Sequence, residues 1–317
     1  MKYTLAPLAE FTNAPFRRLC ARLGADGTTT EMVSAAALMH GHVATRQLME
    51  TLPGEPPPAV QIFCAAEEEA AFAAREISRG VAAGDFAKFP YMELNAGCPM
   101  PRIRAVGAGA ALADDPERVA RLLAAMKREA AMPIALKTRL GPRPDCVRLF
   151  ELLSAAETSG AVRITLHARF TSQMHSGEVH LDLLAEACAR SRIPVCGNGG
   201  VKNAADASAM AQTGVCEIMI GRAALPEPAI FSSLKGEPAD ADAGRLFSAH
   251  LDAIVEFHAL LCGKYADVPP LEPFAMRFVR THLMRYFHSI PGAAGIRRKL
   301  ALATSLAEAR DIASAKQ

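Results

Sequence analysis

The sequence lacks the features that would assign it to a membrane or to a highly charged partner. Its 317 residues contain 35 Lys and Arg against 33 Asp and Glu, which gives a formal net charge of +2. Overall charge therefore predicts no polyanionic partner, and any contact with nucleic acid has to come from a local patch. No run of about eighteen uncharged apolar residues occurs, and the first residues, MKYTLAP, lack the apolar core of a signal peptide. We therefore expect a cytoplasmic protein without a membrane span.

The cysteines lack the spacing of a metal site or of a disulfide framework. Eight occur, at positions 20, 64, 98, 146, 188, 196, 216 and 262, and none forms a CxxC pair. Cys64, Cys196 and Cys216 lie in apolar, strand-like runs, where a thiol usually acts as a small hydrophobic side chain. This pattern predicts reduced thiols and no metal ion.

What the sequence does have is a repeated alternation of strand-like and helical segments. DPERVARLLAAMKREA shows the helical pattern best, since Asp115 can cap it and Pro116 suits its first turn. About eight strand–helix units in roughly 230 residues predict an α/β fold, a (β/α)8 TIM barrel. An open doubly wound sheet would need a Gly-rich dinucleotide motif in its first turn, which LAPLAEFTNAPF does not provide. The predicted strands are Thr4–Ala9, Gly27–Met32, Ala59–Cys64, Tyr91–Asn95, Ile134–Arg139, Val162–His167, Ile193–Gly197 and Glu217–Gly221.

A change of composition divides the chain after the barrel. GEPADADAGR, residues 236–245, is small, polar and acidic, and we interpret it as a linker. The segments that follow, such as LFSAHLDAIVEFHALLC and PFAMRFVRTHLMRYFHSI, have helical patterns. The sequence thus predicts a barrel domain over residues 1–235 and a small all-helical domain over 246–317.

Polar or glycine residues stand at the carboxyl end of nearly every predicted strand. Barrel enzymes place their active sites at this end, whereas ordinary loop residues would be distributed over both ends. The pattern therefore predicts an active site built from several strands. In chain order the residues are Pro7, Leu8 and Ala9, then Glu31, Gln61, Asn95 with Cys98, Lys137 and Arg139, His167 and Arg169, Asn198 with Gly199 and Gly200, and Gly221 with Arg222.

The last two loops are typical of a phosphate site. Barrels commonly bind phosphate after their seventh and eighth strands, and GNGGVKNAADA and GRAALPEP supply glycines there. Arg222 can add a planar guanidinium. This indicates a phosphorylated substrate or a cofactor with a phosphate tail, such as FMN. Lys137 can stabilise negative charge on a reduced flavin, or it can form a Schiff base as in barrel aldolases.

Cys98 lies between Gly97 and Pro99 on a loop over the predicted barrel mouth. This placement does not suit packing, and the thiol can be a nucleophile, a metal ligand or a proton donor. No second Cys or His lies at ligand spacing. A free thiol is mostly protonated at neutral pH, which suits a general acid.

The ordered motifs resemble those of the tRNA-dihydrouridine synthases, a bacterial FMN-dependent family. The resemblance runs from residue 6 to 225 and continues in MRFVRTHLMRYFHSIPGAAGIRRKL. The matching barrel segments are APLAEFTNAPFRRL, TEMVSAAAL, QIF, ELNAGCP, GAGAALADDP, KTRLG, TLHARFTSQMHSGEVHLDLL, CGNGGV and IMIGRAAL.

The resemblance implies a flavin enzyme that reduces a uridine in the D-loop of tRNA. NADPH would reduce the flavin, whose N5 would pass hydride to C6 of a flipped-out uracil, and Cys98 would protonate C5. Asn95, Arg139 and Arg169 would contact the target nucleotide. The implied FMN contacts are Pro7, Leu8, Ala9, Gln61, Lys137, His167, Asn198, Gly199, Gly200, Gly221 and Arg222.

The C-terminal helices carry a local basic patch that predicts tRNA binding. Arg277, Arg280 and Arg285 share an arc of a helical wheel with His288, opposite apolar residues such as Val279. The expected RNA-binding residues are Arg277, Arg280, Arg285, Arg297 and Arg298, and Arg102 and Arg104 would extend the patch toward Cys98.

Other readings stay open at the level of sequence. They are a dihydroorotate-dehydrogenase-like flavoprotein, a lyase that uses Lys137, and a non-catalytic RNA-binding barrel. The chain also departs from the family pattern at Glu10, at Asn13, and in the loop after Cys98. We expect a monomer, and the sequence does not indicate which D-loop uridine is reduced.

Overall fold

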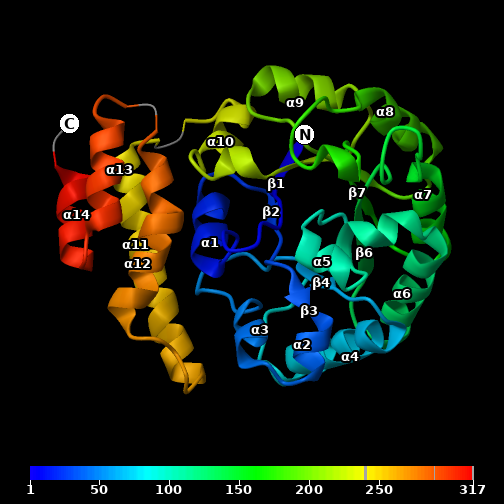
Figure 1. Ribbon diagram of the computed structural model, residues 1–317, viewed down its shortest axis with the longest axis horizontal. Coiled ribbons are helices and arrows are strands. Elements are labelled where there is room, and N and C mark those ends of the chain that lie inside the picture. The colour runs from blue at the N-terminus through cyan, green and yellow to red at the C-terminus, as the bar shows by residue number, and fades with distance from the viewer. Residues whose placement is uncertain (239–240, 289, 316–317) are drawn as a thin grey trace.

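The computed structural model describes residues 1–238, 241–288 and 290–315, and it shows a parallel β-barrel with a helical bundle beside it (Figure 1). The strands form one sheet in the order β2-β1-β9-β8-β7-β6-β5-β4-β3, and every pair is parallel. They are β1 (Lys2–Leu5), β2 (Gly27–Thr28), β3 (Val33–Ser34), β4 (Val60–Phe63), β5 (Met92–Ala96), β6 (Ile134–Arg139), β7 (Ile164–His167), β8 (Val195–Asn198) and β9 (Glu217–Ile220).

The barrel closes through the segment between β2 and β3, which together occupy one position of the barrel. β2 pairs with β1, and β3 pairs with β4. Between them the Ala59 amide donates to the Thr28 carbonyl at 2.8 Å, and the Ala59 carbonyl accepts from the Thr30 amide at 2.9 Å. These bonds join the two edges of the sheet, and the predicted barrel fold is confirmed.

Most predicted strands differ from the observed ones by one or two residues at an end, and the first two differ more. The prediction of one strand over Gly27–Met32 is wrong, because β2 ends at Thr28 and the next strand, β3, begins only at Val33. The prediction of a strand over Thr4–Ala9 is also wrong in extent, since β1 ends at Leu5. Pro7 has no amide to continue the ladder, and the Leu8 carbonyl accepts the amides of Phe11 and Thr12 in a turn.

Helices follow the strands and cover the outside of the barrel. α6 begins as the sequence predicts, with the Asp115 carboxylate accepting the Arg118 amide and Pro116 in the first turn. The barrel helices are α1 (Ala14–Arg22), α2 (Ala35–Met39), α3 (Val43–Gln47), α4 (Glu67–Ala83), α5 (Pro101–Ala105), η1 (Gly109–Asp114), α6 (Pro116–Glu129), α7 (Leu149–Thr158), η2 (Thr171–Gln173), α8 (Leu181–Arg190), α9 (Ala204–Ala211), η3 (Arg222–Ala224) and α10 (Ile230–Lys235).

The C-terminal part is helical, as predicted, and begins earlier than expected. Its first helix starts at Ala243, inside the predicted linker 236–245, because the Asp242 side chain caps it. Residues 239–240 of that linker and residues 316–317 lie outside the described residues. The helices are α11 (Ala243–Lys264), α12 (Leu271–Thr281), η4 (Leu283–Tyr286), α13 (Ala293–Leu302) and α14 (Leu306–Ser314).

Among the described residues, only α11 is long and apolar enough to cross a membrane by length and composition. Its side chains Phe247, Leu251 and Ile254 are buried within the protein, as in the core helix of a globular domain. The absence of a membrane span therefore stays a prediction.

The bundle is fastened to the barrel by polar and aromatic contacts. Arg18 of α1 pairs with Glu256 of α11 at 2.5 Å. Glu50, which follows α3, accepts hydrogen bonds from Lys264 at 2.7 Å and from the Tyr265 hydroxyl at 2.6 Å. Segments separated by more than 200 residues in sequence are thereby held together.

Two buried histidines lie at the centre of this interface. His250 Nδ1 lies 2.7 Å from the Tyr286 hydroxyl, and His282 Nε2 lies 3.2 Å from the Leu225 carbonyl of the barrel. Both imidazoles are fully buried against Phe16. Within the described residues, His250 Nε2 and His282 Nδ1 have no hydrogen-bond partner. Burial lowers both pKa values, that of His282 to about 3. Both side chains are therefore neutral at neutral pH.

We predict that acid weakens the docking of the bundle. The unfolded histidines bind protons below a pH of about 6.5, while the folded ones resist protonation, so the free energy of unfolding falls as pH drops below that value. The loss amounts to about 1.4 kcal/mol per pH unit for each histidine until its folded pKa is reached. Denaturant titrations between pH 7 and 5 measure it.

The double variant His250→Asn with His282→Gln retains the two hydrogen-bonding positions and removes the titration. Its stability should vary less with pH than that of the wild type. His42→Gln, at an exposed position, is the control. Parallel pH curves for the double variant and the wild type would contradict the assignment.

Candidate active site

The carboxyl ends of the strands meet at one rim of the barrel, and polar side chains from non-neighbouring strands bond across its interior. Lys137 of β6 donates to the Asn198 side chain of β8 at 2.9 Å, and Thr165 of β7 donates to Glu93 of β5 at 3.2 Å. Such bonds form only between side chains that point into the barrel. The structure therefore brings these residues of four strands together.

The Cys98 loop is held by the end of β5. The Asn95 side-chain oxygen accepts the amide of Gly97 at 3.1 Å and that of Cys98 at 2.9 Å. The Cys98 carbonyl accepts the Ala110 amide at 2.9 Å. Gly109 is required there, since a Cβ at its φ of +59° would lie 2.7 Å from that carbonyl oxygen. The thiol remains partly exposed.

Asn95 itself is one member of a longer series of hydrogen bonds. Its side-chain NH₂ donates to the Gln61 oxygen at 2.8 Å, and the Gln61 NH₂ donates to Glu93 at 2.7 Å. Glu93 is a site residue that the sequence motifs were not expected to contribute. The signal was present, because a carboxylate two positions before Asn95 in an apolar strand points to the same face.

Arg139 is buried, which differs from the expected contact with a target nucleotide. Its side chain is 1 % exposed, and it donates to the carbonyl of Gly97 at 2.8 Å and to that of Phe170 at 3.2 Å. Burial lowers its pKa to about 10, with Arg169 adding to the shift. Arg139 thus fastens the loop that carries Cys98.

The mouth of the barrel is electropositive. Burial lowers the pKa of Lys137, and the Glu93 carboxylate opposes that shift. The pKa of His167 lies well below its ordinary value because of burial and then of Arg139, so this imidazole is neutral at neutral pH. Arg169 donates to the Gly177 carbonyl at 3.1 Å and lies 3.3 Å from His167 Nε2. The positive charge at the mouth therefore comes from Lys137, Arg139 and Arg169 and not from His167.

The two glycine loops lie beside these cations. Gly199 has a φ of +113°, and a Cβ on it would lie 2.7 Å from the His167 ring. Gly200, with a φ of +82°, would meet Val179 at 2.6 Å. After β9, Gly221 precedes Arg222, whose side chain donates to the His175 carbonyl at 2.7 Å. The loops after β8 and β9 thus approach the mouth closely with little side-chain bulk.

The first loop places its residues at the edge of the mouth. Pro7 and Leu8 are partly exposed, and Ala9 is exposed. Glu10 has a φ of +72° and donates its amide to the Glu31 carboxylate at 2.5 Å. Burial raises the pKa of Glu31. The unusual residue at position 10 is therefore accommodated by a backbone contact to Glu31.

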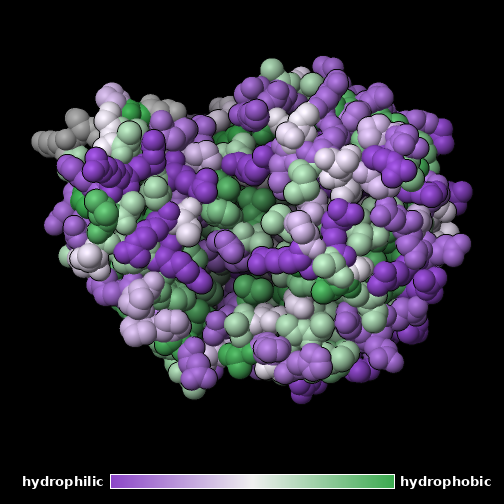
Figure 2. All heavy atoms as spheres, viewed as in Figure 1, coloured by the Kyte–Doolittle hydropathy of each residue, from purple (hydrophilic) through white to green (hydrophobic). Residues whose placement is uncertain are grey.

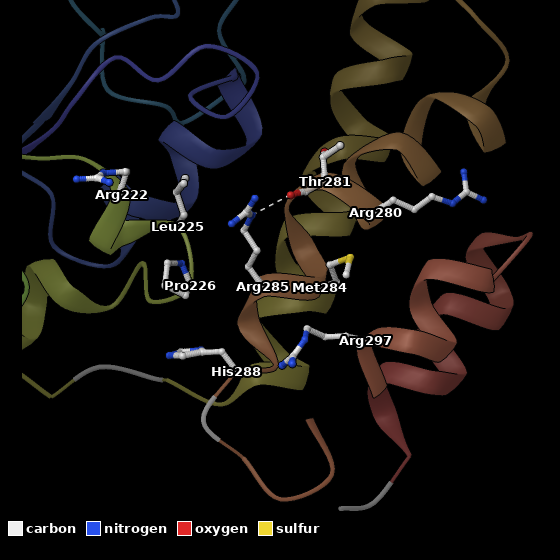
Figure 3. Close-up of a pocket in the computed structure, with 9 residues that line it drawn as sticks. All are labelled: Arg222, Leu225, Pro226, Arg280, Thr281, Met284, Arg285, His288 and Arg297. Carbon is white, nitrogen blue, oxygen red and sulfur yellow. Dashed lines mark hydrogen bonds between the residues drawn. The ribbon is translucent and has the colours of Figure 1, made fainter. Parts of the chain in front are cut away.

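A cleft of about 640 Å³ separates the barrel mouth from the bundle. Figure 3 shows Arg222, Leu225 and Pro226 on the barrel side facing Arg285 and His288 on the bundle side. Five of its nine lining residues are basic and none is acidic, which makes the cleft suitable for a polyanion. In the space-filling view a hollow with apolar residues at its floor separates the two parts (Figure 2).

The basic side chains of the bundle do not all face this cleft. Arg285 extends toward the barrel over the Phe11 ring, 5.2 Å from its centroid. Arg280 also lines the cleft, but its side chain extends away from the barrel (Figure 3) and donates to the carbonyls of Ala301 and Ala303 at the end of α13. The chain does not form the single helix on which the common arc was expected, because α12 ends at Thr281 and η4 follows it, although Arg280, Arg285 and His288 all line the cleft.

Of the other predicted basic residues of the bundle, one lines the cleft and two are exposed outside its lining. Arg297 lines the cleft and donates to the Phe287 carbonyl at 2.5 Å. Arg277 is exposed and lies over the Phe278 ring at 4.8 Å, and Arg298 is exposed on α13. Arg102 and Arg104 are exposed on α5, directly after the Cys98 loop.

Comparisons with known proteins agree on one family. The model of the dihydrouridine synthase family matches residues 4–317. A probable tRNA-dihydrouridine synthase of Mycobacterium tuberculosis is 31% identical over 320 residues, covering 96% of this chain and 79% of that protein. tRNA-dihydrouridine synthase B of Xanthomonas campestris is 31% identical over 308 residues, covering 93% and 86%. A solved structure of FabK from Thermotoga maritima has a TM-score of 0.41 at 14% identity, covering 72% of this chain and 60% of that one, which is too distant to inform the function.

We predict that Gly199→Ala displaces His167. The added methyl group would overlap the imidazole, and the left-handed backbone adds strain, so the variant should lose about 1–3 kcal/mol of stability. Denaturant titration measures the loss, and the NMR signals of the His167 ring report its displacement. Gly84→Ala is the matched control, since Gly84 has a φ of +81° with open space around it and should cost only about 1 kcal/mol. Equal losses for the two variants would show that the predicted overlap does not occur.

Proposed function

Because the chain belongs to the dihydrouridine synthase family, we propose that it is an FMN-dependent tRNA-dihydrouridine synthase, which uses NADPH to reduce the C5–C6 double bond of a D-loop uridine. The relatives named above are matched over most of their length, which supports carrying over the activity as a whole. The observation that carries the proposal is the partly exposed Cys98 thiol on a braced loop at an electropositive barrel mouth.

The residues at the mouth fit FMN. Gly199 and Gly200 pack closely against His167 and Val179, so their backbone reaches the mouth without side-chain bulk, and Arg222 offers a phosphate-compatible guanidinium after β9. Lys137 supplies a cation inside the barrel, suited to the negative charge of a reduced flavin ring. Pro7, Leu8, Ala9, Gln61, His167, Asn198 and Gly221 are the further proposed contacts. When bound, FMN supplies the hydride for C6 of the uracil, and NADPH restores it.

The chain's own contribution to the reaction centres on Cys98. Its thiol holds a proton at the barrel mouth and delivers it to C5 of the target uracil. Asn95 and Arg139 fasten the backbone on both sides of Gly97, so the thiol is held in place before substrate arrives. Because Asn95 and Arg139 bond to the backbone of the Cys98 loop, we propose loop positioning for them. The Arg169 side chain bonds to the Gly177 carbonyl instead, so nucleotide contact is proposed for Arg169 among the three.

We propose that tRNA binds across the cleft between barrel and bundle. Arg285, Arg297 and His288 line it without an acidic neighbour, and Arg277 and Arg298 extend the basic surface over the bundle. A uridine must leave the tRNA stack to reach Cys98, so the binding energy has to come mainly from backbone contacts around it. A monomer is sufficient for this arrangement, since both walls of the cleft belong to one chain.

The first test is reconstitution. The protein purified with FMN and supplied with NADPH should form dihydrouridine in unmodified tRNA, mapped by position. Cys98→Ala should retain FMN and tRNA binding and lose roughly 10²–10⁴-fold in turnover, the usual contribution of a general acid. Cys262→Ala, at an exposed cysteine of α11, is the control and should behave as the wild type. Normal turnover in Cys98→Ala would refute the proton-donor role.

The second test separates the arginines of the bundle. Arg285→Ala should weaken tRNA binding and reduce the slope of log K against log salt by about one. Arg280→Ala should keep that slope but lose about 1 kcal/mol of stability, because carbonyls at the end of α13 lose their donor. Filter binding at several salt concentrations and thermal melting measure the two effects. A reduced slope for Arg280→Ala alone would reverse the assignment.

A further inference from the structure

Three hydrogen bonds in series lead from a carboxylate inside the barrel to the Cys98 loop. The Gln61 NH₂ donates to Glu93 Oε1 at 2.7 Å, and the Asn95 NH₂ donates to Gln61 Oε1 at 2.8 Å. The Asn95 oxygen then accepts the Cys98 amide at 2.9 Å. The series passes from β5 to β4, back to β5, and into the loop.

The chemistry of Glu93 decides the orientation of both amides. The Glu93 oxygen that faces Gln61 accepts a hydrogen bond, so Gln61 turns its NH₂ toward Glu93. This leaves the Gln61 oxygen facing Asn95, which must present its NH₂ in turn. The Asn95 oxygen then faces the loop, where it accepts the amides of Gly97 and Cys98. With either amide reversed, like groups would face each other.

The residues of the series are buried. Glu93 is 0 % exposed, Gln61 1 % and Asn95 7 %. If a side-chain amide of this series were reversed, its polar groups would lose their hydrogen bonds and find no replacement. The orientation of each amide in the series is therefore important for stability.

Glu93 is itself held at both oxygens. Its Oε2 accepts the Thr165 hydroxyl from across the barrel at 3.2 Å. Burial raises the pKa of Glu93, and the positive charges of Lys137 and Arg163 oppose that rise. The two oxygens of Glu93 thus face the side chains of Gln61 and Thr165.

We propose that Glu93 is a positioning residue, whose carboxylate orients Gln61 and Asn95 so that Asn95 holds the Cys98 loop in its reactive placement. The catalytic consequence rests on the proposed function of Cys98 as proton donor. The claim that Glu93 orders the Cys98 loop does not depend on that function, and it is tested by measurements that need no enzymatic activity.

Two substitutions of Glu93 distinguish the effect of its hydrogen-bond acceptor from the effect of its charge. Glu93→Met removes the acceptor in a side chain of similar length. Glu93→Gln removes the charge but can keep the series, because its amide oxygen can accept from Gln61 while its NH₂ donates to the Thr165 hydroxyl. Both variants are prepared as the full chain with FMN, and thermal melting confirms that each is folded.

The structural measurement is hydrogen exchange at the Gly97 and Cys98 amides, together with the rate of Cys98 alkylation by iodoacetamide. Exposed Cys216 and Cys262 serve as internal references in the same peptide map. Glu93→Met should raise exchange and change the alkylation rate by roughly tenfold, whereas Glu93→Gln should stay within about threefold of the wild type.

The catalytic measurement is the division between kcat and KM. Glu93→Met should lower kcat for dihydrouridine formation roughly tenfold or more, with KM for tRNA within about twofold, because the loop and not the RNA surface is altered. Glu93→Gln should restore most of kcat.

Unchanged exchange at Gly97 and Cys98 in Glu93→Met would overturn the proposal. So would a Glu93→Gln variant as impaired as Glu93→Met, since charge rather than polarity would then be decisive. If Glu93→Met does not fold, Thr165→Val removes the hydroxyl that anchors Glu93 and should raise exchange several-fold, and no rise would overturn the proposal. Full activity in Cys98→Ala would refute the proton-donor role while leaving the exchange result intact, so the two failures are distinguishable.

Discussion

The site depends on the closure of the barrel. One residue, Ala59, uses its amide and its carbonyl to join the two edges of a sheet whose strands are only two to six residues long. Closure turns alternate side chains of each strand inward and brings the strand ends to one rim. Only then can Lys137 of β6 reach Asn198 of β8, or Thr165 of β7 reach Glu93 of β5. An open sheet with the same strands would leave these pairs apart.

The interior of this barrel is polar toward its mouth, which carries a cost that the hydrogen bonds offset. Each of these buried polar side chains forms a hydrogen bond with another side chain, which offsets the cost of removing it from water. They are Glu93, Gln61, Asn95 and Lys137. Such a group defines one arrangement more sharply than an apolar core does. At the Cys98 loop, that arrangement holds the backbone amides of Gly97 and Cys98.

The bundle adds a second surface whose position is set by the interface with the barrel. Neutral, buried His250 and His282, together with ion pairs at its edge, hold α11 and η4 against α1 and the loop after β9. That loop carries Arg222 and Leu225 into the basic cleft, while η4 carries Arg285. The same contacts that fasten the bundle therefore define the space available to a bound polyanion.

Much of this protein is determined by local sequence. The alternation of strands and helices, the start of α6 at Asp115 and Pro116, and the gathering of chemical groups after each strand follow from short-range patterns of hydrophobicity and turn residues. The motif around Cys98 also identified the family. Tertiary structure alone decided the extent of the second strand, the burial of Arg139 and the bonding of Arg280 to the end of α13, because each depends on contacts between distant segments. The position of Glu93 at the start of a series of hydrogen bonds is of the same kind: its partners Gln61 and Thr165 lie 32 and 72 residues away. No window of sequence contains such a contact, and only closure of the barrel creates it.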